Sequence, residues 1–559
     1  MNRCTTASAL AVLCALGSPG AAAEAPGAAA RDHVETRPIP SEAYRHGALP
    51  PGDEPLDALD RDAPFPAEGL DMALPTDWTG PGPEDDMPLR LAVEDTVFMA
   101  LRNNRSLAAE QLRPAIAGTF EAVERAVFDP VVFAEVSTGR DRTLQQFQEL
   151  DVAPEERRSE TERVEGGVRQ SLPTGTDLEL SVRSDRSDRS GVPEQFTGRL
   201  GVTMTQALLR GGRIASNLAS LRQAEIDTLA SVYELRGFAE NLVAETENAY
   251  WDYVLADQRV AIFEEALAVA EKQLDETRRR IRAGDRPETD EAAAEAEAAL
   301  RRQGLTDARN GREAARLTLL RLINPPGASW ATRVETVDRP DVVDLPLGGV
   351  DDHVRLGRSL RPELNESRLQ VRRGELEVVR TRNGLLPRLD FFVTLGKSGF
   401  ADSFGRAWRD IDGPGFDFRA GLEMEAPLQR RGPQAEHQRS QLAREQAWQA
   451  VLNLRQLVDL DVRRAWLEVE RTREQVEAVA ATRALQEEVV RAEQARFNAG
   501  QTTAVVVAQA QRDLLESQLE ESEAAASWRQ AVTELHRTSG TLLLRRGVGM
   551  PGDEEIVAQ

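Results

Sequence analysis

Hydrophobic and polar positions along this chain follow two periods, one helical and one extended. Residues 213–283 contain no proline and one glycine, and as a single helix they would be about 107 Å long. Residues 434–499 contain neither Gly nor Pro and predict a second helix of about 99 Å, followed by a third helical segment at 501–539. An apolar seam at spacings of four and three runs through Phe263, Leu267, Ala270, Leu274, Thr277 and Ile281. Helices this long are stable in water only if they pack along their length.

Short stretches between the helical segments alternate apolar and polar residues. Residues 416–425 alternate without exception, and residues 196–206 place apolar side chains on one face and Thr or Arg on the other. Two further alternating sets are Leu178, Leu180, Val182 and Leu389, Phe391, Val393, Leu395. This period predicts strands with one apolar and one wet face. Strands of a soluble antiparallel sheet and of a membrane channel share the pattern, so it leaves both open.

The landmarks of the chain occur twice. Residues 280–284 (Arg-Ile-Arg-Ala-Gly) return as residues 496–500 (Arg-Phe-Asn-Ala-Gly), 216 residues later. A second pair at this spacing is Ala249-Tyr250 with Ala465-Trp466. Pro130 returns as Pro387 after 257 residues, so the first copy carries about 41 additional residues beyond Pro130. Each copy has the order helix, strands, very long helix, Gly turn, helix, which predicts pseudo-symmetric packing of two tandem repeats.

The beginning of the chain predicts export. Residues 1–23 combine Arg3, a short apolar run and an Ala-Ala-Ala cleavage site, which is typical of a secretory signal peptide. Both cysteines, Cys4 and Cys14, lie in this segment, so we expect no disulfide or thiolate metal site after cleavage. Residues 24–88 are rich in proline and predict an extended or disordered arm. No later apolar stretch reaches the roughly 18 residues of a transmembrane helix.

Charge and composition exclude several function classes. The net charge is −24 and no basic patch offsets it, which argues against nucleic acid as a partner. The five histidines are scattered without metal-ligand spacing. Charged residues on the helices are expected to be solvated flanks of coiled coils, and no nucleophile motif or phosphate loop is present. We therefore expect no enzyme, no cofactor and no metal site.

Export, the missing cysteines and helices of about 100 Å together favour a membrane channel over a soluble sheet. A few strands per chain cannot close a barrel, and open sheet edges are not tolerated in lipid. Several copies of the chain would therefore have to share one barrel.

Specific sequence blocks support this interpretation. The most specific is residues 496–503 (Arg-Phe-Asn-Ala-Gly-Gln-Thr-Thr), followed by residues 510–516 (Ala-Gln-Arg-Asp-Leu-Leu-Glu). Weaker blocks are residues 89–91, 100–104, 206–212 and 426–428. Over residues 89–540 the chain resembles outer-membrane efflux proteins of the TolC family. The resemblance implies a mixed α and β fold, in which a homotrimer forms a long antiparallel α-helical coiled-coil barrel in the periplasm. It also implies a shared transmembrane β-barrel of twelve strands in the outer membrane, four from each chain.

The resemblance also implies a role for the Gly turns. They would be the tips that meet a periplasmic membrane-fusion adaptor linked to an inner-membrane pump. The predicted tip residues are Ala283, Gly284, Asp285, Ala499, Gly500, Gln501 and Thr502.

The predicted periplasmic pore mouth departs from the family pattern. Family members often carry Asp six and nine residues after the second tip glycine, where this chain has Val506 and Gln509. Asp290 matches the acidic position of the first copy, but Thr502 stands where the best-studied members have its Arg partner. Neither the acidic constriction nor the ionic latch is therefore intact. The predicted mouth consists of Asp290, Val506 and Gln509.

The predicted organisation places the first repeat at 89–324, with its tip near 284, and a linker at 325–351. The second repeat covers 352–540, with its tip near 500, and a tail covers 541–559. Residues 164–171 and 176–183, joined by Pro173-Thr174-Gly175, predict an additional hairpin in the first copy. From the sequence it would enter the barrel, extend a surface loop or replace a strand after Pro130.

The function that this resemblance implies is a passive exit duct of a tripartite efflux system, in which the inner-membrane pump selects the cargo. One alternative is the exit duct of a type I protein secretion system. An alternative of another class is a soluble periplasmic or cell-surface coiled-coil scaffold.

Overall fold

The computed structural model describes residues 88–145, 155–284, 287–327, 329–340 and 348–549. The predicted signal peptide, nearly all of the predicted N-terminal arm and residues 550–559 of the predicted tail lie outside the described residues. Asp285 of the first predicted tip also lies outside them.

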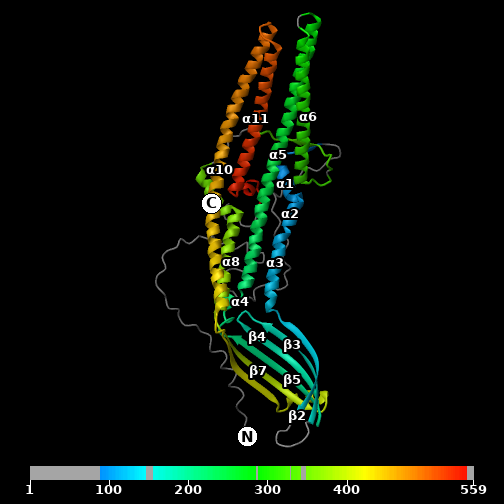
Figure 1. The fold of residues 1–559 in the computed structure, drawn as a ribbon, viewed down its shortest axis with the longest axis vertical. Helices are drawn as coiled ribbons and strands as arrows, with labels where there is room; N and C mark the ends of the chain where they lie inside the picture. Colours follow the sequence, from blue (N-terminus) through cyan, green and yellow to red (C-terminus); the bar gives the residue numbers. More distant parts are fainter. Residues whose placement is uncertain (1–87, 146–154, 285–286, 328, 341–347, 550–559) are drawn as a thin grey trace, which may run out of the picture. The chain divides into compact units, whose positions relative to one another are not determined.

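The first copy runs from short helices into four strands and returns through two long helices (Figure 1). Its elements are β1 (Leu89–Leu91), α1 (Val93–Asn103), α2 (Arg105–Glu110), α3 (Leu112–Arg125), η3 (Ala126–Phe128), β2 (Val131–Gln145), β3 (Glu155–Ser171), β4 (Thr176–Arg189), β5 (Val192–Ala207), α4 (Ile214–Asn217), α5 (Ala219–Arg282) and α6 (Thr289–Ile323).

The second copy repeats this order with two long strands in place of four. Its elements are β6 (Val334–Thr336), α7 (Val350–Leu360), α8 (Pro362–Gly384), β7 (Arg388–Ala401), α9 (Phe404–Arg409), η4 (Asp410–Asp412), β8 (Phe416–Glu425), α10 (Arg431–Asn498), α11 (Ala504–Thr538) and α12 (Leu542–Arg545). The order of elements that the sequence predicts is thus seen in both copies.

One antiparallel sheet contains the long strands of both copies, in the order β2-β3-β4-β5-β7-β8. The family resemblance implied four strands from each chain, whereas the described residues place six in this sheet. The additional two are β3 and β4, which lie between β2 and β5. The predicted extra hairpin therefore enters the sheet, because its backbone pairs with a strand on each side. It accounts for most of the additional chain beyond Pro130.

The long helices form two hairpins, α5 with α6 and α10 with α11 (Figure 1). The helices α5 and α10 have 64 and 68 residues, so each is about 100 Å long. On the predicted seam of α5, Ala270 and Leu274 form a buried cluster with Ala298 of α6. The helices thus gain stability from lateral packing, as their length requires.

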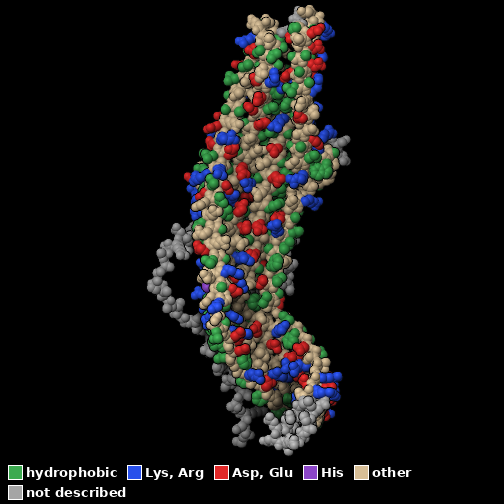
Figure 2. Space-filling view, in the orientation of Figure 1, with side chains coloured by type: hydrophobic (Ala, Val, Ile, Leu, Met, Phe, Trp, Pro, Cys, Tyr) green, Lys and Arg blue, Asp and Glu red, His purple; other side chains and the backbone are tan. Residues whose placement is uncertain are grey.

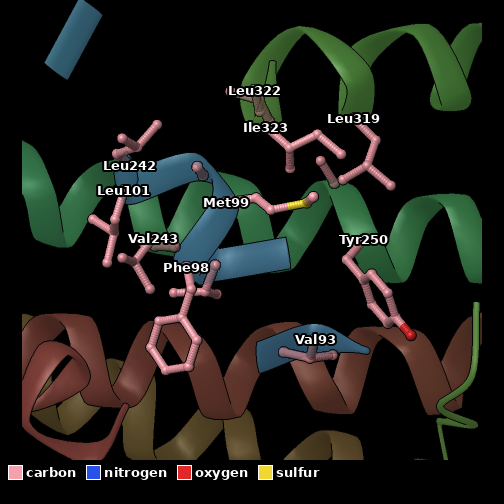
Figure 3. Packing of buried hydrophobic residues seen from close by; sticks show 14 of the residues in the cluster. Val93, Phe98, Met99, Leu101, Leu242, Val243, Tyr250, Leu319, Leu322 and Ile323 are labelled. Atoms are coloured by element: carbon pink, nitrogen blue, oxygen red, sulfur yellow. The ribbon is translucent and has the colours of Figure 1, made fainter. Parts of the chain in front are cut away.

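The largest hydrophobic core joins α1, α5, α6 and α12 (Figure 3). Figure 3 labels Val93, Phe98, Met99, Leu101, Leu242, Val243, Tyr250, Leu319, Leu322 and Ile323. The fully buried Tyr250 hydroxyl lies 3.1 Å from both the Leu91 carbonyl oxygen and a carboxylate oxygen of Asp338. A second core joins α7, α10 and α11; it contains Ala465, and Trp466 packs against it. The repeated landmarks Tyr250 and Trp466 thus pack in corresponding cores of the two copies.

An acidic pair lies between α3 and α5. Burial raises the pKa of Glu225 to about 7, and the carboxylate of Glu121 adds to this shift, whereas Arg125 and Arg222 oppose it. Burial also raises the pKa of Glu121, against a hydrogen bond from Thr228 and the charge of Arg125.

This pair predicts a pH dependence of stability. Between about pH 4.5 and pH 7 the folded chain retains a proton on Glu225 that the unfolded chain releases, so the free energy of unfolding falls as pH rises. The E225Q variant should lose this part of the pH dependence and be more stable than the wild type at pH 8. Thermal unfolding of detergent-solubilised protein at pH 5 and pH 8 measures both effects. Glu265→Gln, at an exposed position of α5, is the control; an E225Q profile identical to the wild-type profile contradicts the prediction.

Candidate functional site

One face of the sheet is apolar on every strand. In the pairing register, one residue of each strand lies directly opposite one residue of the neighbouring strand. One such row across the sheet consists of Val132, Val168, Leu180, Val202, Leu395 and Phe418. Facing residues of neighbouring strands point to the same side, so the row crosses the whole sheet on one face.

These apolar side chains are exposed. Across the whole apolar face, the exposed fraction of these side chains runs from 37% at Leu178 to 79% at Val132. The others on this face are Val136, Val164, Val168, Leu180, Val182, Leu200, Val202, Leu395, Phe416, Phe418, Leu422 and Met424. A continuous apolar surface of this kind marks a contact with a partner protein or with lipid.

The opposite face is polar, and its charged side chains pair across strands. Arg183 donates two hydrogen bonds to the Glu165 carboxylate, at 2.8 and 2.9 Å. Arg199 of β5 reaches across β7 to Asp417 of β8, at 2.6 Å. Figure 2 shows basic and acidic side chains lying together over the sheet. This face is therefore suited to water.

The short helix α9 lies between β7 and β8 and packs on the apolar face. A Cβ atom at Gly198 of β5 would lie 3.2 Å from the Trp408 ring, so glycine makes room for the indole. Phe404 and Trp408 line a hollow of about 790 Å³ together with Val164 and Val182. This helix was not predicted from the sequence, although the spacing of four between the two aromatic residues is a weak helical signal.

The hairpin turn at residues 173–175 is attached to the corner that follows β5. The Asn217 side-chain amide donates to the carbonyl oxygens of Pro173 and Gly211, at 2.9 and 2.7 Å. The Ala207 amide donates to the Gly175 carbonyl oxygen at 2.8 Å. Gly175 has φ +77°, and a Cβ atom there would lie 2.1 Å from the Gly211 carbonyl oxygen, so only glycine fits.

The two predicted tips have the same backbone geometry. Ala283 and Ala499 end α5 and α10 with φ −80° in both, and Gly284 and Gly500 follow with φ +81° and +74°. A Cβ atom at either glycine would meet nothing within 4 Å. Glycine is thus required at the tips for its left-handed backbone and not for lack of space.

The tips of the two hairpins contact each other. The guanidinium of Arg280 lies over the ring of Phe497, 5.6 Å from its centroid, and Phe497 is buried. Asp290 and Ala504 line a small hollow with these two residues. The structure therefore brings Asp290, from the first copy, next to the tip of the second. The Arg280–Phe497 contact was not predicted, because the repeated sequence motif does not indicate that the two tips are in contact.

The remaining predicted residues lie at the second tip and in α11, the helix that follows it. The backbone N–H of Gln501 donates to the Arg496 carbonyl oxygen at 2.8 Å, which closes the turn. Thr502 is half-buried. Val506 and Gln509 are exposed on α11, and the Gln509 amide donates to Asp513 at 2.7 Å. Both side chains are thus available to line a surface.

Comparison with known proteins agrees with this geometry. The sequence model described as "Outer membrane efflux protein" matches residues 97–325 and 355–541, which is most of the chain. The chain belongs to this family. The resemblance to TolC-like channels is thereby confirmed, and members of the outer membrane efflux protein family are channels rather than enzymes. None of the curated protein sequences matches the chain.

Solved structures share the fold of this efflux protein at low sequence identity. The outer membrane channel CmeC of Campylobacter jejuni is 13% identical, with a TM-score of 0.61, and the match covers 88% of this chain and 98% of CmeC. The outer membrane channel MtrE of Neisseria gonorrhoeae is 17% identical, with a TM-score of 0.57 and coverages of 81% and 89%. A membrane protein from Pseudomonas aeruginosa is 20% identical, with a TM-score of 0.60 and coverages of 80% and 90%.

Two features are absent from the described residues. None of the helices there contains a segment apolar and long enough to span a membrane. No group of three or more His, Cys, Asp or Glu side chains in the same part of the chain is placed to hold a metal ion.

Proposed function

We propose that three copies of this chain form the passive exit duct of a tripartite efflux system in the outer membrane. The observation that carries the proposal is the exposed apolar face that crosses all six strands of the antiparallel sheet. A coiled-coil scaffold in water would leave this surface without a partner, whereas a membrane wall covers it with lipid. The polar opposite face, with its paired charges, would then line the water-filled duct.

Closure by several copies follows from the sheet edges. In the part of the chain that the structure describes, β2 and β8 each pair with one neighbour only. Open edges are not tolerated in lipid, so the edge of one copy must pair with that of the next. With six antiparallel strands in sequence, β2 and β8 run in opposite directions, and their pairing continues the antiparallel pattern around a closed barrel.

The long helices would continue this duct into the periplasm. Each is about 100 Å long and leads away from a strand of the sheet, so the tips lie far from the membrane. The paired tips, with residues 283–285 and 499–502, would bind the adaptor that links the duct to an inner-membrane pump. Residues Asp290, Val506 and Gln509 would form the periplasmic mouth.

The oligomer is the first test. We expect the full chain to require detergent for extraction from outer membranes and to be trapped as a trimer by chemical cross-linking, because the sheet edges of one copy have no other partner. A stable detergent-solubilised monomer or dimer contradicts the proposal. Release by high salt alone would support the soluble scaffold instead.

Adaptor binding is tested by changing the backbone of the tips. Valine at positive φ costs about 1–3 kcal/mol, so the double variant G284V, G500V should distort both turns and abolish efflux, measured as drug or metal susceptibility. The trimer and its membrane insertion should be unchanged, because space around both glycines is open. G311V is the matched control, since Gly311 lies within α6, also has open space, and has ordinary helical geometry. Unchanged susceptibility in the double variant would count against the tips as the binding site.

The pore mouth is tested by its response to cations. Val506 and Gln509 would give an apolar and a neutral ring, with Asp290 the nearest acidic contribution, so the isolated channel should resist block by trivalent cations. The double variant V506D, Q509D should create such block, because two stacked rings of carboxylates deepen the local field. Planar-bilayer recordings measure both. High-affinity block of the wild type, or none in the double variant, means that other residues line the mouth.

A further inference from the structure

We propose that the inserted hairpin, β3 with β4, is part of the transmembrane wall, so that the trimer forms a barrel of eighteen strands instead of twelve. The inference rests on the proposed function, which supplies the trimer and the membrane. It goes beyond that function because it assigns the hairpin a place and changes the width of the duct.

Backbone pairing places the hairpin inside the sheet and not beside it. Strand β3 pairs with β2 along the full length of β2, from Val131 with Arg169 to Gln145 with Glu155. On the other side, β4 pairs with β5, and this pairing begins at Thr176, which lies opposite Gln206. Removing the hairpin from the wall would therefore expose one edge of β2 and one of β5, in addition to the two edges that face neighbouring copies.

The hairpin also has the two faces that a membrane wall requires. Its apolar side chains continue the row of the neighbouring strands, with Val168 beside Val132 and Leu180 beside Val202. They are exposed by 39% at Val168 and 48% at Leu180. A hairpin standing in water outside the barrel would gain nothing from an apolar face directed to the outside.

On its polar face the hairpin makes a charged contact with β2 and another between its own two strands. Arg169 of β3 lies over the ring of Phe133 in β2, 5.7 Å from its centroid. Glu165 of β3 and Arg183 of β4 form the two-bond ion pair described above, between side chains exposed by only 12% and 30%. The first contact holds the hairpin in line with β2, and the second continues the charged, water-facing side of the sheet across the hairpin.

The turn of the hairpin is fixed on the side where the helices begin. The Asn217 amide joins the carbonyl oxygen of Pro173 to that of Gly211, in the corner between β5 and α4. The hairpin thus spans the same distance as its neighbours, from the helical side of the sheet to the far side.

The consequence is a wider barrel. At equal strand spacing and tilt, the circumference grows with strand number, so eighteen strands give about 1.5 times the diameter and about 2.2 times the cross-section of twelve. The hairpin adds no helix, because its two open ends, which connect to β2 and β5, lie on the side of the sheet away from α3 and α5. The additional width therefore belongs to the membrane segment alone.

Single cysteines test the inference, because the sequence contains no cysteine after Cys14. In native outer membranes, V164C on β3 and L180C on β4 should resist a membrane-impermeant maleimide, whereas R163C and S181C should be labelled. The reference pair on β5 is V202C, expected to be protected, and T203C, expected to be labelled. These six substitutions lie on strand surfaces, so folding should be preserved, and insertion is checked by trimer cross-linking.

The outcomes separate the two proposals. Alternating protection on β3, β4 and β5 supports the eighteen-stranded barrel. Alternation on β5 with full labelling of both positions on β3 and β4 overturns this inference and leaves the proposed function intact. Loss of alternation on β5 as well overturns both. As a second measurement, a cryo-EM cross-section of the trimer in nanodiscs should contain eighteen strands, and twelve would overturn the inference.

Discussion

The backbone hydrogen-bonding groups at the two edges of the sheet constrain the rest of the structure. Every strand carries such groups on both sides, and in the described part of the chain β2 and β8 are satisfied on one side only. Water satisfies such an edge in a soluble protein. Here, however, the edges bound a sheet whose apolar face is exposed on all six strands, and in the proposed duct this face meets lipid, where open edges are not tolerated. In the proposed duct a single chain is therefore an incomplete wall, and further copies of the same chain complete it.

The helices meet a different constraint with the same solution. A helix of 64 residues has no core of its own and is stable only where a neighbour covers its apolar side. Each of the two repeats supplies that neighbour by folding back at a glycine with positive φ. At the tips, the repeats contact each other through Arg280 and Phe497. The cores around Tyr250 and Ala465 then fix the hairpins beside the short helices of each repeat. Lateral packing thus decides the architecture of the helices, as edge pairing decides that of the sheet.

Long-range periodicity is what made much of this fold predictable from sequence. The helices around 213–283, 434–499 and 501–539, the glycine turns and the strands near 196–206, 389–395 and 416–425 follow from patterns that hold over many residues. Pairing partners do not follow, because alternation gives the faces of a strand but not its neighbours, and so the place of β3 and β4 had to come from the structure. The Trp408–Gly198 contact was missed for a related reason: a six-residue helix carries too little pattern, and its partner lies some two hundred residues away. At the tips, the sequence identified the glycines but not the contact that Arg280 makes with Phe497.

The position of the inserted hairpin explains why the duplicated fold tolerates it. The helix-to-strand junctions of both copies lie on β2, β5, β7 and β8, and the insertion leaves all four on the same side of the sheet. A single added strand would deliver β5 in the opposite direction, with α5 leaving from the wrong end. Two added strands return the chain to the side from which it came and keep every neighbouring pair antiparallel. Strand number in such a sheet can therefore grow by hairpins while the helices and their tips stay as they are. In the proposed duct, the width of the membrane segment would then change independently of the tips that are proposed to bind the adaptor.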